Sequence, residues 1–294
     1  MHKINFNKLE KVLKNLSVKK GDNIYLGIDL FKIADFLKVK KINRYKFVEE
    51  LLNFFLSKLG KKGNLIIPVF NFECVKKKEF NQKESIGQSG ALGSLLLKKY
   101  YQHRTHHPFY SFLCFGRKRK IYTKIKNVNA TGKYSLWYYF IKDNFDLVTL
   151  GHHFSRSFTH IHYLENLKNI NYRFNKKFTL KYTDKNNKIK RESFSFFARK
   201  KNICEFSGIT KSFDKHIFKN KFLKFFKYEK LISFKLNIKK CSSIISEDLL
   251  KEKPDFVSFI KKNKKNIDII SDKNINNLEK KYLKKIKNNC RLID

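Results

Sequence analysis

The sequence is poor in the residues that break or cross-link a chain. Its 294 residues include only 3 Pro and 11 Gly, which argues against a disordered or collagen-like protein. The 5 cysteines are widely scattered and form no Cys-x-x-Cys pair, so the sequence predicts reduced thiols and no metal site. They are Cys74, Cys114, Cys204, Cys241 and Cys290.

Long apolar runs are also absent. No stretch approaches about 18 uncharged apolar residues, so we expect no transmembrane helix and no membrane partner. The N-terminal segment MHKINFNKLEKVLKNL contains Glu10 and lacks the apolar core of a signal peptide. We therefore expect a cytoplasmic protein.

Acidic residues are scarce. Asp and Glu total 25 against 66 Lys and Arg, which gives a formal net charge of +41. Such a charge is typical of nucleic-acid-binding proteins, but the cations are mostly Lys, are spread along the whole chain and accompany abundant Asn, Ile and Phe. We interpret this mixture as the composition of an AT-rich genome and expect no specific nucleic-acid partner. The charge would still attract a phosphorylated cofactor or an anionic substrate.

The order of the predicted elements indicates the fold class. Hydrophobic residues make up 41% of the chain, enough for a sizeable core. Residues 44–59 form the clearest helix, because their apolar side chains recur with a period of about 3.6 residues. Apolar runs at 23–28, 65–70 and 145–150 indicate buried strands. This alternation predicts an α/β fold, a three-layer α/β/α sandwich with a mixed central sheet.

The pattern changes after residue 165. More strands, of an antiparallel kind, are predicted at 173–180, 189–199 and 232–238, and helices at 215–228 and 246–259. We expect residues 1–260 to form a single α/β domain. Lys and Asn dominate residues 261–294, which we expect to form a solvated helical tail.

The candidate site lies in GHHFSRSFTHIHYLE, residues 151–165. Thr159, His162 and Glu165 are three residues apart, so neighbouring members of this series share one face of a helix. That helix would follow the carboxyl end of strand 145–150, where open α/β sheets bind ligands. An imidazole beside a carboxylate suits general-base chemistry, although such a spacing by itself is more often a solvated surface pair. His160 would face the other side of the helix, and we expect it to be dispensable.

Further motifs precede this stretch in a fixed order. Residues 20–26 read KGDNIYL, residues 63–70 read GNLIIPVF, and residues 104–111 read RTHHPFYS. Together with a Gly-x-Leu helix at residue 90 and the Thr-x-x-His-x-x-Glu series, they resemble the aminoglycoside 3-N-acetyltransferase family. The resemblance covers roughly residues 20–165 and includes relatives that acetylate amino sugars for surface polysaccharides.

The resemblance implies that an acetyl group passes from acetyl-CoA to a sugar amine. No cysteine lies beside a histidine in any motif, so direct transfer is favoured over an acyl-enzyme, and no metal is expected. The resemblance further implies that His162 is the general base and that Glu165 orients the imidazole or holds the amine. Thr159 would be a supporting hydrogen-bond donor. The protein could also form a homodimer.

The resemblance also implies residues that contact acetyl-CoA. Asp29 would face the ligand, Arg104 would lie near a phosphate, and His107 and Ser111 would line the CoA channel. An alternative for the last two stays open, in which His107 shapes a turn before Pro108 and Ser111 satisfies a buried backbone group.

The acceptor is less closely defined. A nucleotide-linked amino sugar is favoured over an aminoglycoside, because binding a polycationic drug calls for acidic residues, and this chain is depleted in them. The alternatives are an aminoglycoside acetyltransferase, a basic nucleic-acid-binding protein and a non-catalytic family member. The last is kept open by two departures: Gly27-Ile28-Asp29 stands where the family carries His-Ser-Ser or His-Ser-Asp, and Asn81 stands where it carries Asp.

Overall fold

The computed structural model describes residues 4–39 and 42–261. The predicted helical tail, residues 261–294, lies outside the described residues except for Lys261. The helices are α1 (Asn7–Asn15), α2 (Leu30–Phe36), α3 (Arg44–Leu59), α4 (Glu73–Lys77), α5 (Ala91–Tyr100), α6 (Arg119–Thr123), α7 (Leu136–Lys142), α8 (Ile161–Leu167), α9 (Lys211–Lys219) and α10 (Ile238–Asp248). The strands are β1 (Asn23–Ile28), β2 (Asn64–Pro68), β3 (Glu79–Asn81), β4 (Phe112–Gly116), β5 (Asp146–Leu150), β6 (Arg173–Thr183), β7 (Ile189–Arg199), β8 (Cys204–Ile209), β9 (Leu223–Tyr228), β10 (Leu231–Asn237) and β11 (Val257–Lys261).

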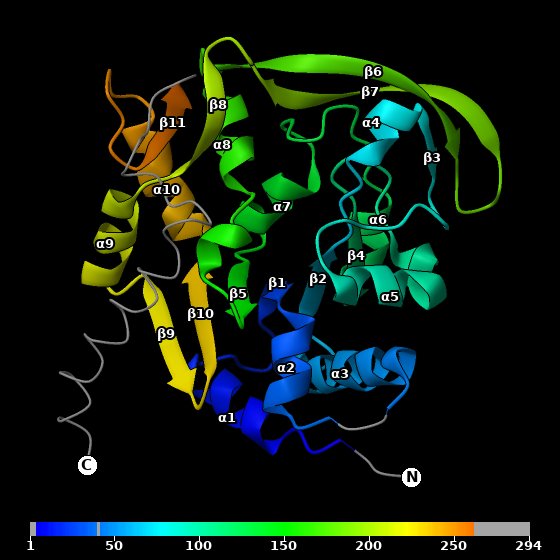
Figure 1. The fold of residues 1–294 in the computed structure, drawn as a ribbon, viewed down its shortest axis with the longest axis vertical. Coiled ribbons are helices and arrows are strands. Elements are labelled where there is room, and N and C mark those ends of the chain that lie inside the picture. The colour runs from blue at the N-terminus through cyan, green and yellow to red at the C-terminus, as the bar shows by residue number, and fades with distance from the viewer. Residues whose placement is uncertain (1–3, 40–41, 262–294) are drawn as a thin grey trace.

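A six-stranded sheet forms the centre of the protein, in the order β4-β2-β1-β5-β10-β9 (Figure 1). Strand β1 pairs in parallel with both β2 and β5. At the two sides, β4 runs antiparallel to β2, β10 runs antiparallel to β5, and β9 runs antiparallel to β10. The mixed central sheet predicted from the sequence is therefore confirmed.

Helices cover both faces of this sheet. Strand β1 shows the division, since Ile24 and Leu26 join one hydrophobic core while Tyr25, pointing the opposite way, joins the other. Buried side chains of α1, α2, α3 and α5 complete the first core. Those of α7, α8, α9 and α10 complete the second. The result is the predicted three-layer α/β/α sandwich.

A long hairpin lies outside the central sheet. Strands β6 and β7 pair antiparallel along their whole length, from Arg173 opposite Arg199 to Thr183 opposite Ile189, and β3 adds to β6 in parallel. Figure 1 shows the hairpin crossing above the central sheet and helices. Strands β8 and β11 form a further antiparallel pair. The predicted increase in antiparallel strands toward the C-terminus is thus observed.

Two helix predictions are wrong in part. The predicted helix 215–228 is α9 followed by strand β9, because Lys221 takes a positive φ of 57° that ends the helix. In the second case α10 starts earlier, capped by the Asn237 side chain, and ends at Asp248. The Asp248 carboxylate then accepts hydrogen bonds from the backbone N–H groups of Asp255 and Phe256, so the chain turns and enters β11.

Other described features bear on the sequence predictions. Within residues 4–39 and 42–261, no helix combines the length and apolarity needed to cross a bilayer. The same residues contain no group of three or more His, Cys, Asp or Glu side chains arranged to hold a metal ion. Four of the cysteines are buried free thiols: Cys74, Cys114, Cys204 and Cys241.

Candidate active site

The Thr-x-x-His-x-x-Glu series places an imidazole against a carboxylate. His162 and Glu165 lie on one face of α8, and His162 Nδ1 is 2.7 Å from Glu165 Oε2. The Glu165 side chain is completely buried, whereas the His162 side chain is 19% exposed. The carboxylate is therefore held inside the protein while the imidazole reaches its surface.

Two further side chains hold the Glu165 carboxylate. The Tyr172 hydroxyl donates a hydrogen bond of 2.8 Å to Oε1, and Arg173 Nε lies 3.0 Å from Oε2. Burial favours the neutral acid, but the charges and hydrogen bonds of His162, Arg173 and Tyr172 outweigh it and hold the pKa of Glu165 below its ordinary value. Glu165 is thus an ionised carboxylate at neutral pH.

The ionised carboxylate determines the tautomer of His162. Because a carboxylate only accepts hydrogen bonds, Nδ1 must carry the proton, and Nε2 is left with a lone pair. Burial and the nearby charge of Arg173 lower the pKa of His162, while Glu165 acts in the opposite direction. The imidazole is therefore neutral near pH 7 and has one nitrogen able to accept a proton.

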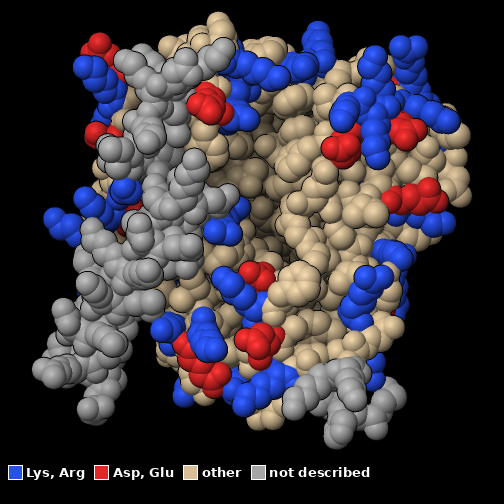
Figure 2. All heavy atoms as spheres, viewed as in Figure 1, with Lys and Arg blue, Asp and Glu red and all other residues tan. Residues whose placement is uncertain are grey.

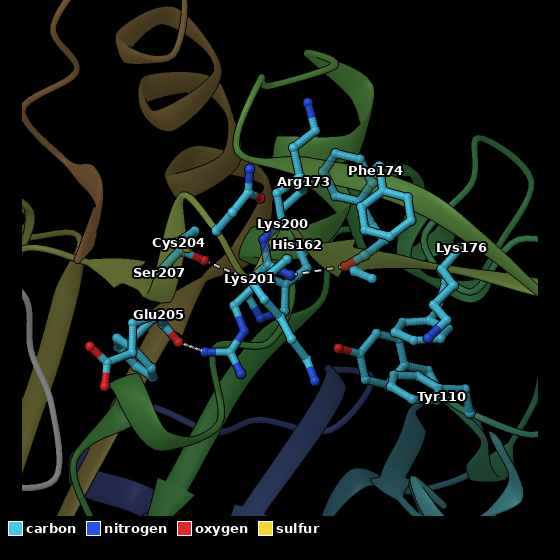
Figure 3. A pocket seen from close by; sticks show the side chains of 17 residues that line it. Tyr110, His162, Arg173, Phe174, Lys176, Lys200, Lys201, Cys204, Glu205 and Ser207 are labelled. Carbon is cyan, nitrogen blue, oxygen red and sulfur yellow. Dashed lines mark hydrogen bonds between the residues drawn. The ribbon is translucent and has the colours of Figure 1, made fainter. Parts of the chain in front are cut away.

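His162 lines a cleft of about 1220 Å³. Figure 2 shows the hollow on this face, beneath the hairpin of β6 and β7. The walls come from α8, β6, the end of β7, the following loop, β8 and the two residues Phe109 and Tyr110 before β4. Figure 3 shows the Tyr110 hydroxyl pointing into the cleft, on the side opposite Cys204 and Ser207. Among the described lining residues, none belongs to β1 or β5, so the cleft is not at the carboxyl ends of those strands, contrary to our expectation.

The cleft is cationic and aromatic. Its cations are Arg173, Lys176, Arg199, Lys200 and Lys201. Its aromatic residues are Phe109, Tyr110, Phe174, Phe196, Phe197 and Phe206. Glu205 is the sole carboxylate among the described lining residues. This composition suits an anionic ligand with apolar or planar parts better than a cation.

Thr159 lies in the turn before α8. Its carbonyl oxygen accepts a hydrogen bond of 3.1 Å from the backbone N–H of His162. Burial raises the pKa of Tyr25 in β1, and the Thr159 side chain nearby partly offsets that rise; Thr159 is not among the residues that line the cleft. Thr159 therefore connects the start of α8 to the central sheet.

Arg104 and Ser111 are structural residues, which corrects the expectation of a phosphate contact. Arg104 is completely buried. Its guanidinium donates to Ser111 Oγ at 3.0 Å and to the carbonyl oxygens of Val69, Gln82 and Ser85. The Ser111 hydroxyl donates to Val69 O at 2.7 Å. Burial lowers the pKa of Arg104 to about 9, so it stays charged near neutral pH. These donors are used within the protein, so they do not reach a phosphate.

His107 is also structural, in agreement with the alternative in which it shapes the turn at Pro108. The side chain is buried, and Nε2 lies 3.2 Å from the carbonyl oxygens of Val128 and Ser195. Nδ1 accepts the backbone N–H of Phe109, just after Pro108. Burial lowers the pKa of His107 to about 3, so it is neutral. His107 therefore shapes the turn that leads into β4 and does not line a channel.

Asp29 and Asn81 cap local structure. The Asp29 side chain accepts the backbone N–H of Lys32 at 3.1 Å and so caps α2. Asn81 Oδ1 accepts the backbone N–H groups of Lys83 and Glu84, which closes the turn after β3. Neither residue lines the cleft. A cofactor role for Asp29 therefore has no support in the geometry.

The sequence reasoning missed Tyr172, Arg173 and the cations that follow β7. A Tyr-Arg pair in a chain with 66 Lys and Arg is no signal by itself. These residues also lie beyond the region where the motifs were recognised. An available clue was their position at the start of a predicted strand directly after the candidate helix.

Comparison with known proteins agrees with this fold. A sequence profile described as aminoglycoside 3-N-acetyltransferase matches residues 34–236, more than half of the chain. A comparison with curated proteins gave no match.

Solved structures resemble the chain over most of its length. Aminoglycoside acetyltransferase AAC(3)-IIb has a TM-score of 0.63 and 15% identity, covering 81% of this chain and 93% of its own. AAC-VIa bound to sisomicin has a TM-score of 0.65 and 14% identity, covering 83% and 97%. AAC-IIIb in a binary complex with CoASH has a TM-score of 0.63 and 12% identity, covering 81% and 93%. At such identities the likeness establishes the fold.

Proposed function

Because the chain belongs to the aminoglycoside 3-N-acetyltransferase family, it is an acetyl-CoA-dependent N-acetyltransferase, and we propose that its acceptor is a nucleotide-linked amino sugar. We propose His162 as the general base and Glu165 as the residue that orients it. The observation that carries this proposal is the hydrogen-bonded His162–Glu165 pair, 2.7 Å between Nδ1 and Oε2, at the wall of the cleft.

The chemistry asks for a base because a sugar amine arrives largely as an ammonium ion. The Nε2 lone pair of His162 would accept the proton of the nitrogen, while Glu165 stabilises the resulting imidazolium through Nδ1–H. The freed amine attacks the thioester carbonyl carbon, a C–N bond forms and the C–S bond breaks. The acylated nitrogen then loses its second proton to the departing CoA thiolate, so CoA leaves as a thiol, and His162 returns the first proton to solvent. No acyl-enzyme is required.

The charge of the cleft supports an acceptor that carries phosphate. Lys200 and Lys201 lie in the loop after β7 and, like Lys176, line the cleft. Lysine side chains suit the phosphate groups of acetyl-CoA and of a nucleotide-linked sugar alike. A polycationic aminoglycoside would meet like charge from these lysines, with Glu205 as the carboxylate in the described lining.

A second candidate acceptor is an aminoglycoside. The description of the matching family profile favours it, and so does the resemblance to AAC-VIa, whose structure holds sisomicin. The two candidates differ in the sign of the acceptor charge.

A thiol-release assay with acetyl-CoA distinguishes them. The panel would contain nucleotide-linked amino sugars, the same amino sugars without phosphate, and sisomicin. We expect CoA release with a nucleotide-linked sugar and weaker release with the uncharged form. Release with sisomicin alone would overturn the acceptor proposal and favour the second candidate.

A further inference from the structure

Arg173 shares the carboxylate of Glu165 with His162. Its Nε lies 3.0 Å from Glu165 Oε2, the same oxygen that lies 2.7 Å from His162 Nδ1. The side chain is 7% exposed. Its other nitrogens are also held: Nη1 donates to Phe197 O at 2.9 Å and Nη2 to Ser207 Oγ at 2.5 Å. The guanidinium therefore has a defined position between β6, β7, β8 and α8.

We propose that Arg173 is a positioning residue of this active site, which keeps His162 neutral and oriented by balancing the charge of Glu165. This inference rests on the proposed role of His162 as the base. Arg173 is not assigned a contact with substrate.

The argument is a balance of charges. The Glu165 carboxylate and the Arg173 guanidinium cancel, so a proton on His162 adds a positive charge that the buried group does not neutralise. A carboxylate paired with His162 alone would favour the imidazolium. Burial lowers the pKa of His162, and Arg173 adds to this effect and opposes the contrary effect of Glu165. The base then starts each turnover able to accept a proton.

Burial makes the larger contribution to the lowered pKa of His162, and among the neighbouring charges Arg173 contributes most to lowering it. Burial raises the pKa of Tyr110 to about 12, and burial and Glu165 also raise the pKa of Tyr172, so both phenols stay neutral. Burial raises the pKa of Cys204 in the same way. Arg199 of β7 also lowers the pKa of His162, by less than Arg173 does.

A purely structural role for Arg173 makes a different prediction. The bonds to Phe197 and Ser207 show that Arg173 also ties the hairpin to β8. If that were its whole role, substitution would lower stability and activity at every pH without moving the pH profile. The acid limb of the pH profile is therefore the decisive readout.

The variants are Arg173→Gln, which removes the charge, and Arg173→Lys, which keeps it. Lys176→Gln is the matched control, because Lys176 lines the same cleft and has no described bond to Glu165. In Arg173→Gln the acid limb of kcat/KM should move upward by about one pH unit or more. Arg173→Lys and Lys176→Gln should move it less. An unmoved limb in a folded Arg173→Gln protein would overturn the proposal.

A titration without any acceptor separates this inference from the proposed function. The His162 ring signals of the intact protein can be followed by NMR between acid and neutral pH, with His162→Ala for assignment. We expect the parent protein to titrate below the ordinary histidine value of about 6.5, and Arg173→Lys to stay below it. Titration of the parent at or above that value would contradict the role of Arg173 even if Arg173→Gln fails to fold. A value that is lowered in the parent and rises in Arg173→Gln, in a protein without transferase activity, would support Arg173 and count against the function of His162.

Discussion

Replacing His162 with Ala removes the proposed base and little else. Glu165 keeps its bonds to Tyr172 and Arg173, so its charge stays paired. The His162 side chain is 19% exposed and gives up its hydrogen bond to the Glu165 carboxylate, so the free energy of unfolding should fall by about 1–3 kcal/mol. The rate of acetyl transfer should fall about 10²–10⁴-fold, equivalent to about 3–5 kcal/mol in the barrier.

The assay is acetyl-CoA-dependent thiol release, measured as a function of pH. The neutral imidazole is the active form, so activity should rise with pH through the pKa of His162 and then level off. Burial and Arg173 lower that pKa, so the limb should lie below about pH 6.5. The variant should lack this limb, and the KM for acetyl-CoA should change little.

His160→Ala is the contrasting variant. The structure corrects the prediction that His160 is dispensable. His160 is completely buried, its Nε2 lies 2.9 Å from Ser242 Oγ, and its ring centroid is 5.8 Å from that of Trp137. Its removal leaves a cavity and should lower the free energy of unfolding by on the order of 2–3 kcal/mol. Thus His160→Ala should lose stability and keep its rate while folded, whereas His162→Ala should lose its rate even while folded. A folded His162→Ala protein that acetylates at the parental rate would refute the assignment.

Three further predictions follow from the site. Acetyl-CoA at a hundredfold excess over Kd should add about 2.7 kcal/mol to the free energy of unfolding and so raise the thermal midpoint. An unchanged midpoint in a thermal scan at millimolar acetyl-CoA would contradict cofactor binding. Arg104→Lys should lower the melting temperature, because Lys cannot replace the four hydrogen bonds of the buried guanidinium. It should leave the KM for acetyl-CoA unchanged, and a raised KM with normal stability would favour the phosphate contact after all. Duplex DNA binding should be weak and steeply lost with added salt, and sequence-selective binding that survives moderate salt in a titration would favour the nucleic-acid alternative.

The central elements could be predicted because their signals are local. The apolar period of α3 and the buried strands β1 and β5 are visible in short windows. Strand β9 was mistaken for a helix because Leu223 to Tyr228 is rich in both apolar residues and Lys, a composition that fits either period. Only the pairing with β10, which places Phe225 opposite Phe234, makes it a strand.

The functional residues were predicted with unequal success for a physical reason. His162 and Glu165 are three residues apart on one helix, so their contact follows from helical geometry. Arg104 was misassigned because a charged side chain in a loop motif normally reaches solvent. Its burial depends on the carbonyl oxygens of segments distant in the sequence, such as Val69 and Ser85.

The sequence by itself determined the α/β class, the strand before the site and the pairing of His162 with Glu165, because each depends on residues close together in the chain. Only the tertiary structure decided that Tyr172 and Arg173, at the entry to β6, reach the same carboxylate. It also decided that the cleft lies under the hairpin and not at the ends of β1 and β5. These features depend on how separate elements fold against one another, and no local pattern of side chains encodes that arrangement.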